Sequence, residues 1–241
     1  MGKYGKKRGR NISPSRKKRQ KQLARRSLIL LVIGIFSIGG MIALCRKIFF
    51  PEGEKRRDPI TAETMSEKDW TGAPSLDVEL LDVNEYSRPG TPLEEVKGIV
   101  IHYVGNPGTS AKANRDYFQG LKDAHITKAS SHFVVGMEGE IVQCIPSSEI
   151  AYASNERNKD TLAIECCHPD ETGKFNDATY QSMVNLTGWL CYRFNLESGD
   201  VIRHYDVTGK ICPKYFVEHE DAWEQFKLNV QNRIDEIKKM G

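Results

Sequence analysis

Three residues with metal-binding side chains, His102, His204 and Cys212, have the types and spacing that metal-dependent chemistry needs. His204 and Cys212 share the run His-Tyr-Asp-Val-Thr-Gly-Lys-Ile-Cys-Pro at residues 204–213, and His102 ends the earlier run Gly-Ile-Val-Ile-His. Two imidazoles and a thiolate form a three-ligand set for Zn²⁺, and such a site keeps its fourth position open for water. Lys210 would add a cation where an oxygen becomes negative during attack on a carbonyl. This pattern predicts a zinc hydrolase.

Glu165 is a further candidate because it is a carboxylate within an apolar strand. Its neighbours Ile164 and Cys166 point to the opposite face of the strand predicted at residues 161–167. A carboxylate in this setting is costly to bury without a partner, and a metal-bound water is a suitable partner. The alternatives are an exposed sheet face or an ion pair with an arginine.

The elements that must position these residues alternate between strands and helices. The sequence predicts strands at residues 98–104, 161–167 and 201–204, and a hairpin formed by residues 131–135 and 140–145. It predicts helices from Ser110 to near Gly120, from Asn176 or Asp177 to Phe194, and a last one that spans the apolar positions 223–237. This order predicts an α/β domain with helices packed on a central sheet.

The predicted strands bring the two histidines together. His102 lies near the end of one strand and His204 ends another, so parallel neighbours would place both imidazoles at the same edge of the sheet. Cys212 would return on the loop that follows. Open α/β sheets usually bind their ligands at this edge.

The N-terminal part of the chain is strongly basic, although the 241 residues carry a net charge of only +3. Residues 1–26 hold 12 of the 35 Lys and Arg and no acid, which leaves 23 basic against 32 acidic side chains for the rest. We expect this leader to be disordered and to bind anionic membrane lipids rather than nucleic acid, because an apolar span follows directly.

Residues 27–44 form a run of 18 residues without a charge. A helix of this length rises about 27 Å, close to the roughly 30 Å of a bilayer core, so we predict a transmembrane anchor at residues 27–45. The cationic leader predicts a cytoplasmic N-terminus and an extracellular catalytic domain in a single-pass protein of the cell membrane. The alternatives are a cleaved signal peptide, a lipid-modified Cys45 and a buried core helix.

Residues 46–75 are predicted to be an extracellular linker, and residues 76–241 the catalytic domain.

Five runs, at residues 98–102, 113–118, 131–133, 162–165 and 204–213, together resemble the zinc-dependent N-acetylmuramoyl-L-alanine amidases of the amidase-2 type. These are related to peptidoglycan recognition proteins and to phage amidase endolysins. The resemblance implies a central mixed β-sheet flanked by helices, with zinc in a surface groove. It also implies hydrolysis of the amide between N-acetylmuramic acid and the L-alanine of the peptidoglycan stem peptide.

The same resemblance assigns roles to single residues. It implies that His102, His204 and Cys212 bind zinc, that Glu165 assists the attacking water, and that Lys210 steadies the tetrahedral intermediate. Three residues are candidates for substrate contact: His132, Tyr103 and Asn106. Relatives often carry a histidine beside the cleft at the position of His132, although a structural hydrogen bond is the equal alternative for this residue.

One departure from the family pattern bears on this interpretation. Many relatives carry a Trp-His pair where this chain has Ala-Tyr-Ala-Ser at residues 151–154, which leaves open how the groove holds its glycan or peptide there. A peptidoglycan-binding module of the same fold without catalysis is the alternative function. Non-catalytic relatives typically lose the zinc cysteine, whereas this chain keeps Cys212.

Four other cysteines are expected to be buried free thiols, with one disulfide as the alternative: Cys144, Cys166, Cys167 and Cys191.

Overall fold

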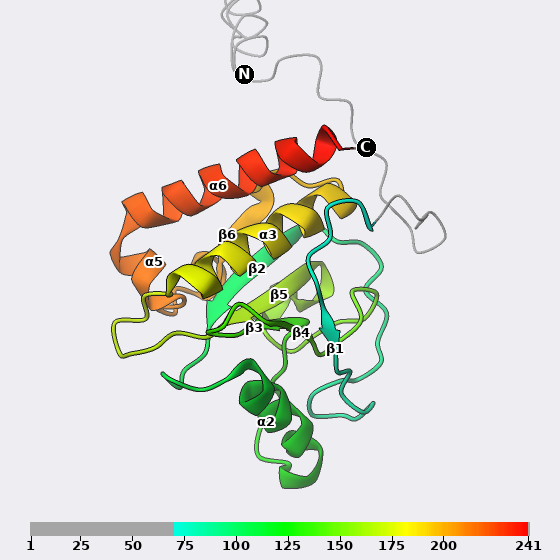
Figure 1. The fold of residues 1–241 in the computed structure, drawn as a ribbon. Helices are drawn as coiled ribbons and strands as arrows, with labels where there is room; N and C mark the ends of the chain where they lie inside the picture. Colours follow the sequence, from blue (N-terminus) through cyan, green and yellow to red (C-terminus); the bar gives the residue numbers. More distant parts are fainter. Residues whose placement is uncertain (1–69, 241) are drawn as a thin grey trace, which may run out of the picture. The chain divides into compact units, whose positions relative to one another are not determined.

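A mixed sheet in the order β1-β4-β3-β5-β2-β6 forms the centre of residues 70–240, the part of the chain that the computed structural model describes (Figure 1). The strands are β1 (Asp77–Val78), β2 (Gly98–Tyr103), β3 (Phe133–Val135), β4 (Ile141–Gln143), β5 (Thr161–Cys166) and β6 (Val201–Arg203). β2 pairs in parallel with both β5 and β6, β3 pairs in parallel with β5, and β3 and β4 form the antiparallel hairpin. The predicted central mixed sheet is therefore confirmed.

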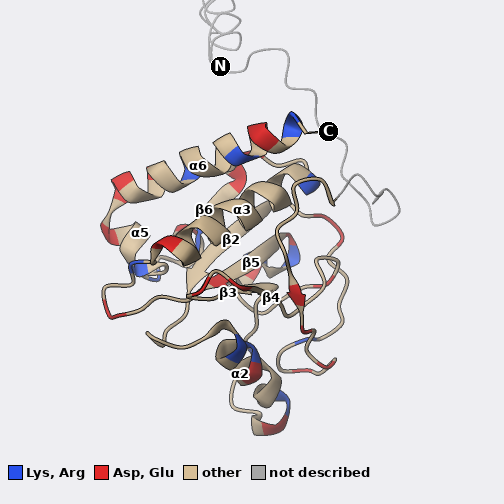
Figure 2. Cartoon of the chain, viewed as in Figure 1, with Lys and Arg blue, Asp and Glu red and all other residues tan. Residues whose placement is uncertain are grey.

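Helices cover both faces of this sheet. α3 (Asp177–Arg193) and α6 (Glu220–Lys238) lie on one face, and α2 (Ala111–Ala124) lies on the other (Figure 1). β2 carries no charged residue and is tan throughout Figure 2, whereas α6 carries both signs of charge along its length. A strand that is buried on both faces has a continuous apolar sequence. This explains the apolar residues 98–101 that precede His102.

The side chains of β2 alternate between the two faces of the sheet, and each face carries a hydrophobic core. Ile99 and Ile101 belong to the core under α3 and α6. Val104, which follows the strand, belongs to the core under α2 together with Phe118 and Leu121. His102 lies two residues before Val104, and residues two apart in a strand point to the same face, so the imidazole points toward the α2 side of the sheet.

α2 is longer than the sequence predicts. Ser110 caps its start, since the Ser110 hydroxyl accepts the Ala113 N–H, but the helix continues through Gly120 to Ala124. It ends at His125, which takes a left-handed backbone conformation with φ of 55°. A glycine inside a helix costs about 1 kcal/mol relative to alanine, and burial of a leucine side chain such as Leu121 contributes roughly 1.5–3 kcal/mol. The predicted end near Gly120 is therefore wrong.

Two strand boundaries also differ from prediction. The hairpin strands β3 and β4 are three residues each, shorter than the predicted segments. β6 ends at Arg203, and His204 is the first residue of α4 (His204–Thr208) instead of the last residue of a strand. The Asp206 carboxylate accepts the Arg203 N–H at 2.8 Å, which caps the new helix and ends the strand.

The predicted transmembrane anchor and basic leader lie outside the described residues. Within residues 70–240, no helix has both the length and the apolar character that a membrane span needs. Trp70, in the segment predicted to be linker, stacks on Trp189 at 5.6 Å between ring centroids, and Ala73 packs against the core. The packed unit thus includes residues that precede the predicted domain start at position 76.

An aromatic cluster fixes α6 against the rest of the domain. Phe226 of α6 is fully buried, and its ring centroid lies 5.2 Å from Phe216 and 5.6 Å from Trp223. Phe216 belongs to α5 (Lys214–Glu218), the short helix that follows Cys212 in the chain. The last helix therefore supports the segment that carries one of the candidate ligands.

Phe226→Ala should lower the free energy of unfolding by about 3–5 kcal/mol, because it removes a fully buried ring and leaves a cavity. Leu228→Ala on the same helix is the matched control: its side chain is 53% exposed, and we expect a change within about 0.5 kcal/mol. Urea unfolding followed by circular dichroism measures both. Equal effects of the two variants would contradict the packing described above.

Candidate functional site

The parallel pairing of β2 and β6 places His102 and His204 side by side. Ile101 pairs with Arg203, so the residue after each of them lies at the same edge of the sheet. The two imidazole centroids are 4.6 Å apart. The predicted meeting of the two histidines is therefore confirmed, although His204 reaches the edge from the first turn of α4.

Cys212 completes the group. The Tyr205 N–H donates to the Cys212 carbonyl at 2.9 Å, which holds the returning loop against α4. The Cys212 sulfur lies 3.9 Å from His102 Nδ1, and the ligand atoms of His102, His204 and Cys212 all lie within 4.8 Å of one another. All three side chains are buried. The cluster has the spacing to hold one metal ion.

The hydrogen bonds of the histidines show which atoms face this position. His204 Nδ1 is buried and has no hydrogen-bond partner among the described residues. A buried nitrogen without a partner costs roughly 1–3 kcal/mol, and a metal ion at the centre of the cluster would supply the missing partner. The donor set of two nitrogens and one sulfur suits Zn²⁺. The residues present therefore fit a zinc ion.

Burial controls the protonation of these ligands. It lowers the pKa of His102 well below its ordinary value, with smaller contributions from His204 and Lys210, and it also lowers the pKa of His204. Both imidazoles are thus neutral, as metal ligands must be. Burial raises the pKa of the Cys212 thiol to about 12, and a bound cation would stabilise the thiolate instead.

Glu165 lies next to His102 in the register of β5 and β2. Its side chain is half-buried, and its Oε2 atom is buried without a hydrogen-bond partner. Burial raises the pKa of Glu165 to about 8, and the positive charge of Lys210 opposes that shift. No arginine forms an ion pair with Glu165 within the described residues, so the arginine alternative is wrong. The carboxyl group is available at the edge of the metal cluster.

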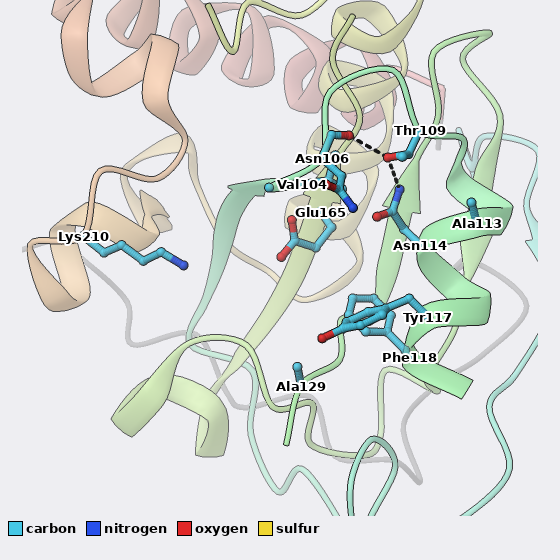
Figure 3. Close-up of a pocket in the computed structure, with 11 residues that line it drawn as sticks. Val104, Asn106, Thr109, Ala113, Asn114, Tyr117, Phe118, Ala129, Glu165 and Lys210 are labelled. Carbon is cyan, nitrogen blue, oxygen red and sulfur yellow. Dashed lines mark hydrogen bonds between the residues drawn. The ribbon is translucent and has the colours of Figure 1, made fainter. Parts of the chain in front are cut away.

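A cavity of about 550 Å³ opens beside Glu165. Figure 3 shows Glu165 between Lys210, which points toward it from the loop after α4, and the α2 residues Asn114 and Tyr117. Lys210 is exposed and forms no ion pair in the described part of the chain. The cavity therefore offers a carboxyl group and an unpaired ammonium group beside the metal cluster, together with amide and aromatic side chains on the opposite wall.

The two predicted substrate contacts near His102 differ in position. Asn106 lines the cavity, and its carbonyl accepts a hydrogen bond from the Thr109 hydroxyl at 2.7 Å. Tyr103 does not line it: its ring is half-buried and stacks on His168 at 5.0 Å between centroids. Asn106 therefore lines the cavity, whereas Tyr103 makes a packing contact with His168.

His132 is buried and supports the sheet. Its Nδ1 atom accepts the Ala163 N–H at 3.0 Å, so Nε2 carries the proton and donates to the Glu149 carbonyl at 2.8 Å. Both ring nitrogens are used by the backbone, and none is left for a substrate. Of the two roles that the sequence leaves open, the structure supports the structural hydrogen bond and corrects the assignment to substrate contact.

Two residues with no sequence signal of their own contact the metal-facing histidines: Ser154 and Asn155. Ser154 belongs to the run that replaces the Trp-His pair of relatives. Asn114 and Tyr117 on the cavity wall were also not identifiable from the sequence, because a helix face reveals its neighbours only after packing. The expected free thiols are confirmed, since Cys144, Cys166, Cys167 and Cys191 are all buried and form no disulfide within residues 70–240.

Comparison with known proteins matches this domain. The family model Amidase_2, described as N-acetylmuramoyl-L-alanine amidase, matches residues 92–215. The N-acetylmuramoyl-L-alanine amidase CwlL of Bacillus licheniformis is 37% identical over 165 residues, which cover 63% of this chain and 45% of that protein. The N-acetylmuramoyl-L-alanine amidase BlyA of Bacillus subtilis (strain 168) is 30% identical over 175 residues, which cover 64% and 46%. The chain spans less than half the length of these relatives.

Solved structures share the fold. The structure of PlyL has a TM-score of 0.58 and 20% sequence identity, and the match covers 66% of this chain and 99% of that one. The catalytic domain of XlyA has a TM-score of 0.55 and 23% identity, with 65% and 99% covered. The sheet flanked by helices that the sequence predicts is thus an arrangement seen in other proteins.

His132→Gln tests the structural role of this histidine through pH. Burial lowers the pKa of His132 to about 4, below its ordinary 6.5. Between pH 6.5 and pH 4 the unfolded chain therefore binds a proton that the folded chain does not, so stability is lost as the pH falls through this window. Glutamine does not titrate, and the acid-induced loss in the free energy of unfolding should be smaller by up to about 3 kcal/mol.

Urea unfolding of both proteins at several pH values from 7 to 4 measures this difference. Identical pH slopes for the two proteins would mean that His132 binds protons in the folded state, as a solvent-exposed histidine of the cleft would.

Proposed function

The chain belongs to the amidase-2 family of N-acetylmuramoyl-L-alanine amidases, and from this we propose that it hydrolyses the amide between N-acetylmuramic acid and the L-alanine of the peptidoglycan stem peptide. The observation that carries the proposal is the convergence of His102, His204 and Cys212 on one position beside the buried carboxyl group of Glu165. A cavity with room for a substrate opens on the same side.

We propose Zn²⁺ as the ion that this cluster holds. Bound there, zinc would supply Lewis acidity and bring the pKa of a water molecule to about 7. Glu165 accepts the proton of the attacking water and returns it to the leaving amine. Burial alone raises the pKa of Glu165 to about 8, and the charge of a bound cation would lower it again, so that the carboxylate form is present to accept the proton.

Lys210 acts on the carbonyl oxygen of the scissile amide. Its side chain points toward Glu165 across the mouth of the cavity and has no ion-pair partner in the described residues, so its charge is available to the substrate (Figure 3). A fixed cation at the place where an oxygen becomes negative lowers the energy of the transition state more than that of the ground state. The exposed position also lets the long side chain follow a bound substrate.

A peptidoglycan-binding module without catalysis is the second candidate. It would need the same cavity but neither a metal cluster nor a buried carboxyl group beside it. The Cys212 side chain and the Oε2 atom of Glu165 are both buried, and burying an ionisable group without a partner is costly. These two residues favour the enzyme.

We further propose that residues 27–45 anchor the chain in the cell membrane, with the basic leader in the cytoplasm against anionic lipids and the catalytic domain outside. The uncharged run and the 12 cations that precede it support this topology. The domain would then work on peptidoglycan close to the outer surface of the membrane.

The activity is tested by incubating the full chain with purified peptidoglycan and detecting released stem peptides with free L-alanine amino groups by mass spectrometry. EDTA should abolish release and added zinc should restore it. Cys212→Ala should lose both zinc and activity, because only two protein ligands remain. A zinc-loaded chain that binds peptidoglycan and releases no peptide would establish the binding module instead.

Two variants separate chemistry from zinc binding. Glu165→Gln should lower kcat by about 10²–10⁴-fold because the proton acceptor is lost, and Lys210→Ala by about 10²–10³-fold because the cation is lost. Both should keep one zinc per chain by elemental analysis. Lys97→Ala is the control, since Lys97 is an exposed lysine at the opposite end of β2 from His102. Loss of zinc in Lys210→Ala would give Lys210 a structural role.

The topology is tested with an epitope tag at each end of the chain. In protoplasts, external protease should remove the C-terminal tag and leave the N-terminal tag intact. Protection of both tags would contradict an extracellular domain, and absence of the N-terminal tag from the mature protein would indicate a cleaved signal peptide.

A further inference from the structure

Two consecutive residues hold the two histidines of the metal cluster, one each. Ser154 Oγ lies 3.1 Å from His102 Nε2, and Asn155 Oδ1 lies 3.2 Å from His204 Nε2. Both contacts are to Nε2, whereas His102 Nδ1 lies 3.9 Å from the Cys212 sulfur and His204 Nδ1 is buried without a partner among the described residues. Ser154 and Asn155 therefore contact the far side of each imidazole, away from the nitrogen that faces the metal position.

The chemistry of Asn155 fixes the proton on His204. An amide oxygen only accepts hydrogen bonds, so His204 Nε2 must donate to it. In a neutral imidazole with a proton on Nε2, Nδ1 carries a free lone pair, and Nδ1 is the buried atom that has no partner in the described residues. The hydrogen bond thus selects the tautomer that can bind a metal.

The same logic applies to His102. Its Nδ1 atom faces the Cys212 sulfur at 3.9 Å, and its Nε2 atom meets the Ser154 hydroxyl. A hydroxyl group can accept as well as donate, so the Ser154 oxygen can accept a hydrogen bond from Nε2–H. Both imidazoles then direct an unprotonated Nδ1 toward the same point.

The segment that carries these two residues is itself fixed. Asn158 Oδ1 accepts the backbone N–H groups of Ala153 at 3.0 Å and of Ser154 at 2.6 Å. Asn155 begins the short 3-10 helix η3 (Asn155–Lys159) with φ of 53°, a left-handed conformation that asparagine tolerates better than most residues. Ser154 is only 1% exposed. The backbone from which both side chains extend is therefore held in place, and burial further restricts the Ser154 side chain, whereas Asn155 is exposed.

We propose that Ser154 and Asn155 are positioning residues that fix the tautomer and the ring orientation of both histidine ligands, and that Asn158 holds them in place. The inference rests on the metal site of the proposed function. It also gives a role to the segment in which this chain departs from the Trp-His pair of its relatives. Hydrogen-bond partners of metal-bound histidines typically change metal affinity by about 10–100-fold when removed.

Zinc affinity of the full chain, measured by competition with a chromogenic chelator, tests the proposal. Ser154→Ala and Asn155→Gly should each bind zinc about 10–100-fold more weakly than the unaltered chain. Glycine accepts positive φ without strain, so Asn155→Gly removes the side chain and keeps the backbone. Asn155→Asp keeps an acceptor oxygen and should restore the affinity.

Asn195→Gly is the matched control. Asn195 also has positive φ, at 57°, and lies in the turn after α3, so the same change at the same backbone conformation should leave zinc affinity unaltered. Unaltered affinity in both Ser154→Ala and Asn155→Gly would overturn the proposal. An equal loss in Asn195→Gly would also overturn it, because a general effect of the substitution would then explain the result.

The tautomers give a readout that needs no variant. In the zinc-free chain, nitrogen NMR shifts of labelled histidine should show the proton on Nε2 of both His102 and His204. Protons on Nδ1 would overturn the proposal. A chain that binds zinc with these tautomers but cleaves no peptidoglycan would refute the proposed activity and leave the positioning role intact, whereas a chain that binds no zinc would refute both.

Discussion

The parallel register of β2 with its two neighbours is the constraint on which the site depends. It places Glu165 beside His102 and brings His204 to the same edge through β6. Side chains alternate between the two faces of a strand, so a slip of one residue would turn His102 into the core under α3 and α6. Ile99 and Ile101 of β2 fill the core under α3 and α6, and Val104 after the strand fills the core under α2, so the packing on the two faces specifies the register. The packing of aliphatic side chains thus sets the geometry of the catalytic ones.

Two buried polar atoms of the site contrast with the buried arginine beside them. Arg203 is buried, but its guanidinium group contacts Asp206, Glu220 and the Phe216 carbonyl, so its charge is fully satisfied. His204 Nδ1 and Glu165 Oε2 have no such partner within residues 70–240. Arg203 directly precedes His204 and ties the start of α4 to α5 and α6. The ion-paired Arg203 therefore holds His204 in place, and the Nδ1 atom of His204 stays available for a ligand.

The sequence predicts β2 and β5 because buried parallel strands have a continuous apolar pattern, and it predicts the meeting of His102 and His204 because both are placed at the ends of predicted strands; it does not predict β1. It does not predict that α2 continues past Gly120, since burial of Leu121 outweighs a local preference. It also cannot assign His132, whose two hydrogen bonds reach residues far away in the chain, Glu149 and Ala163. Ser154 and Asn155 are beyond sequence reasoning for the same reason: their partners are chosen by tertiary packing.

The spacing of His204 and Cys212 has a simple mechanical origin. α4 is one short helix of five residues, and Gly209 ends it with φ of 76°, a conformation that glycine adopts without a steric cost. The chain reverses there and returns along α4, so that the Tyr205 N–H binds the Cys212 carbonyl. Lys210 lies on the reversal and must project outward, over the cavity. The short helix and the chain reversal therefore place His204 and Cys212 close together, with Lys210 between them in the chain. This is why all three residues occur within the ten-residue run 204–213.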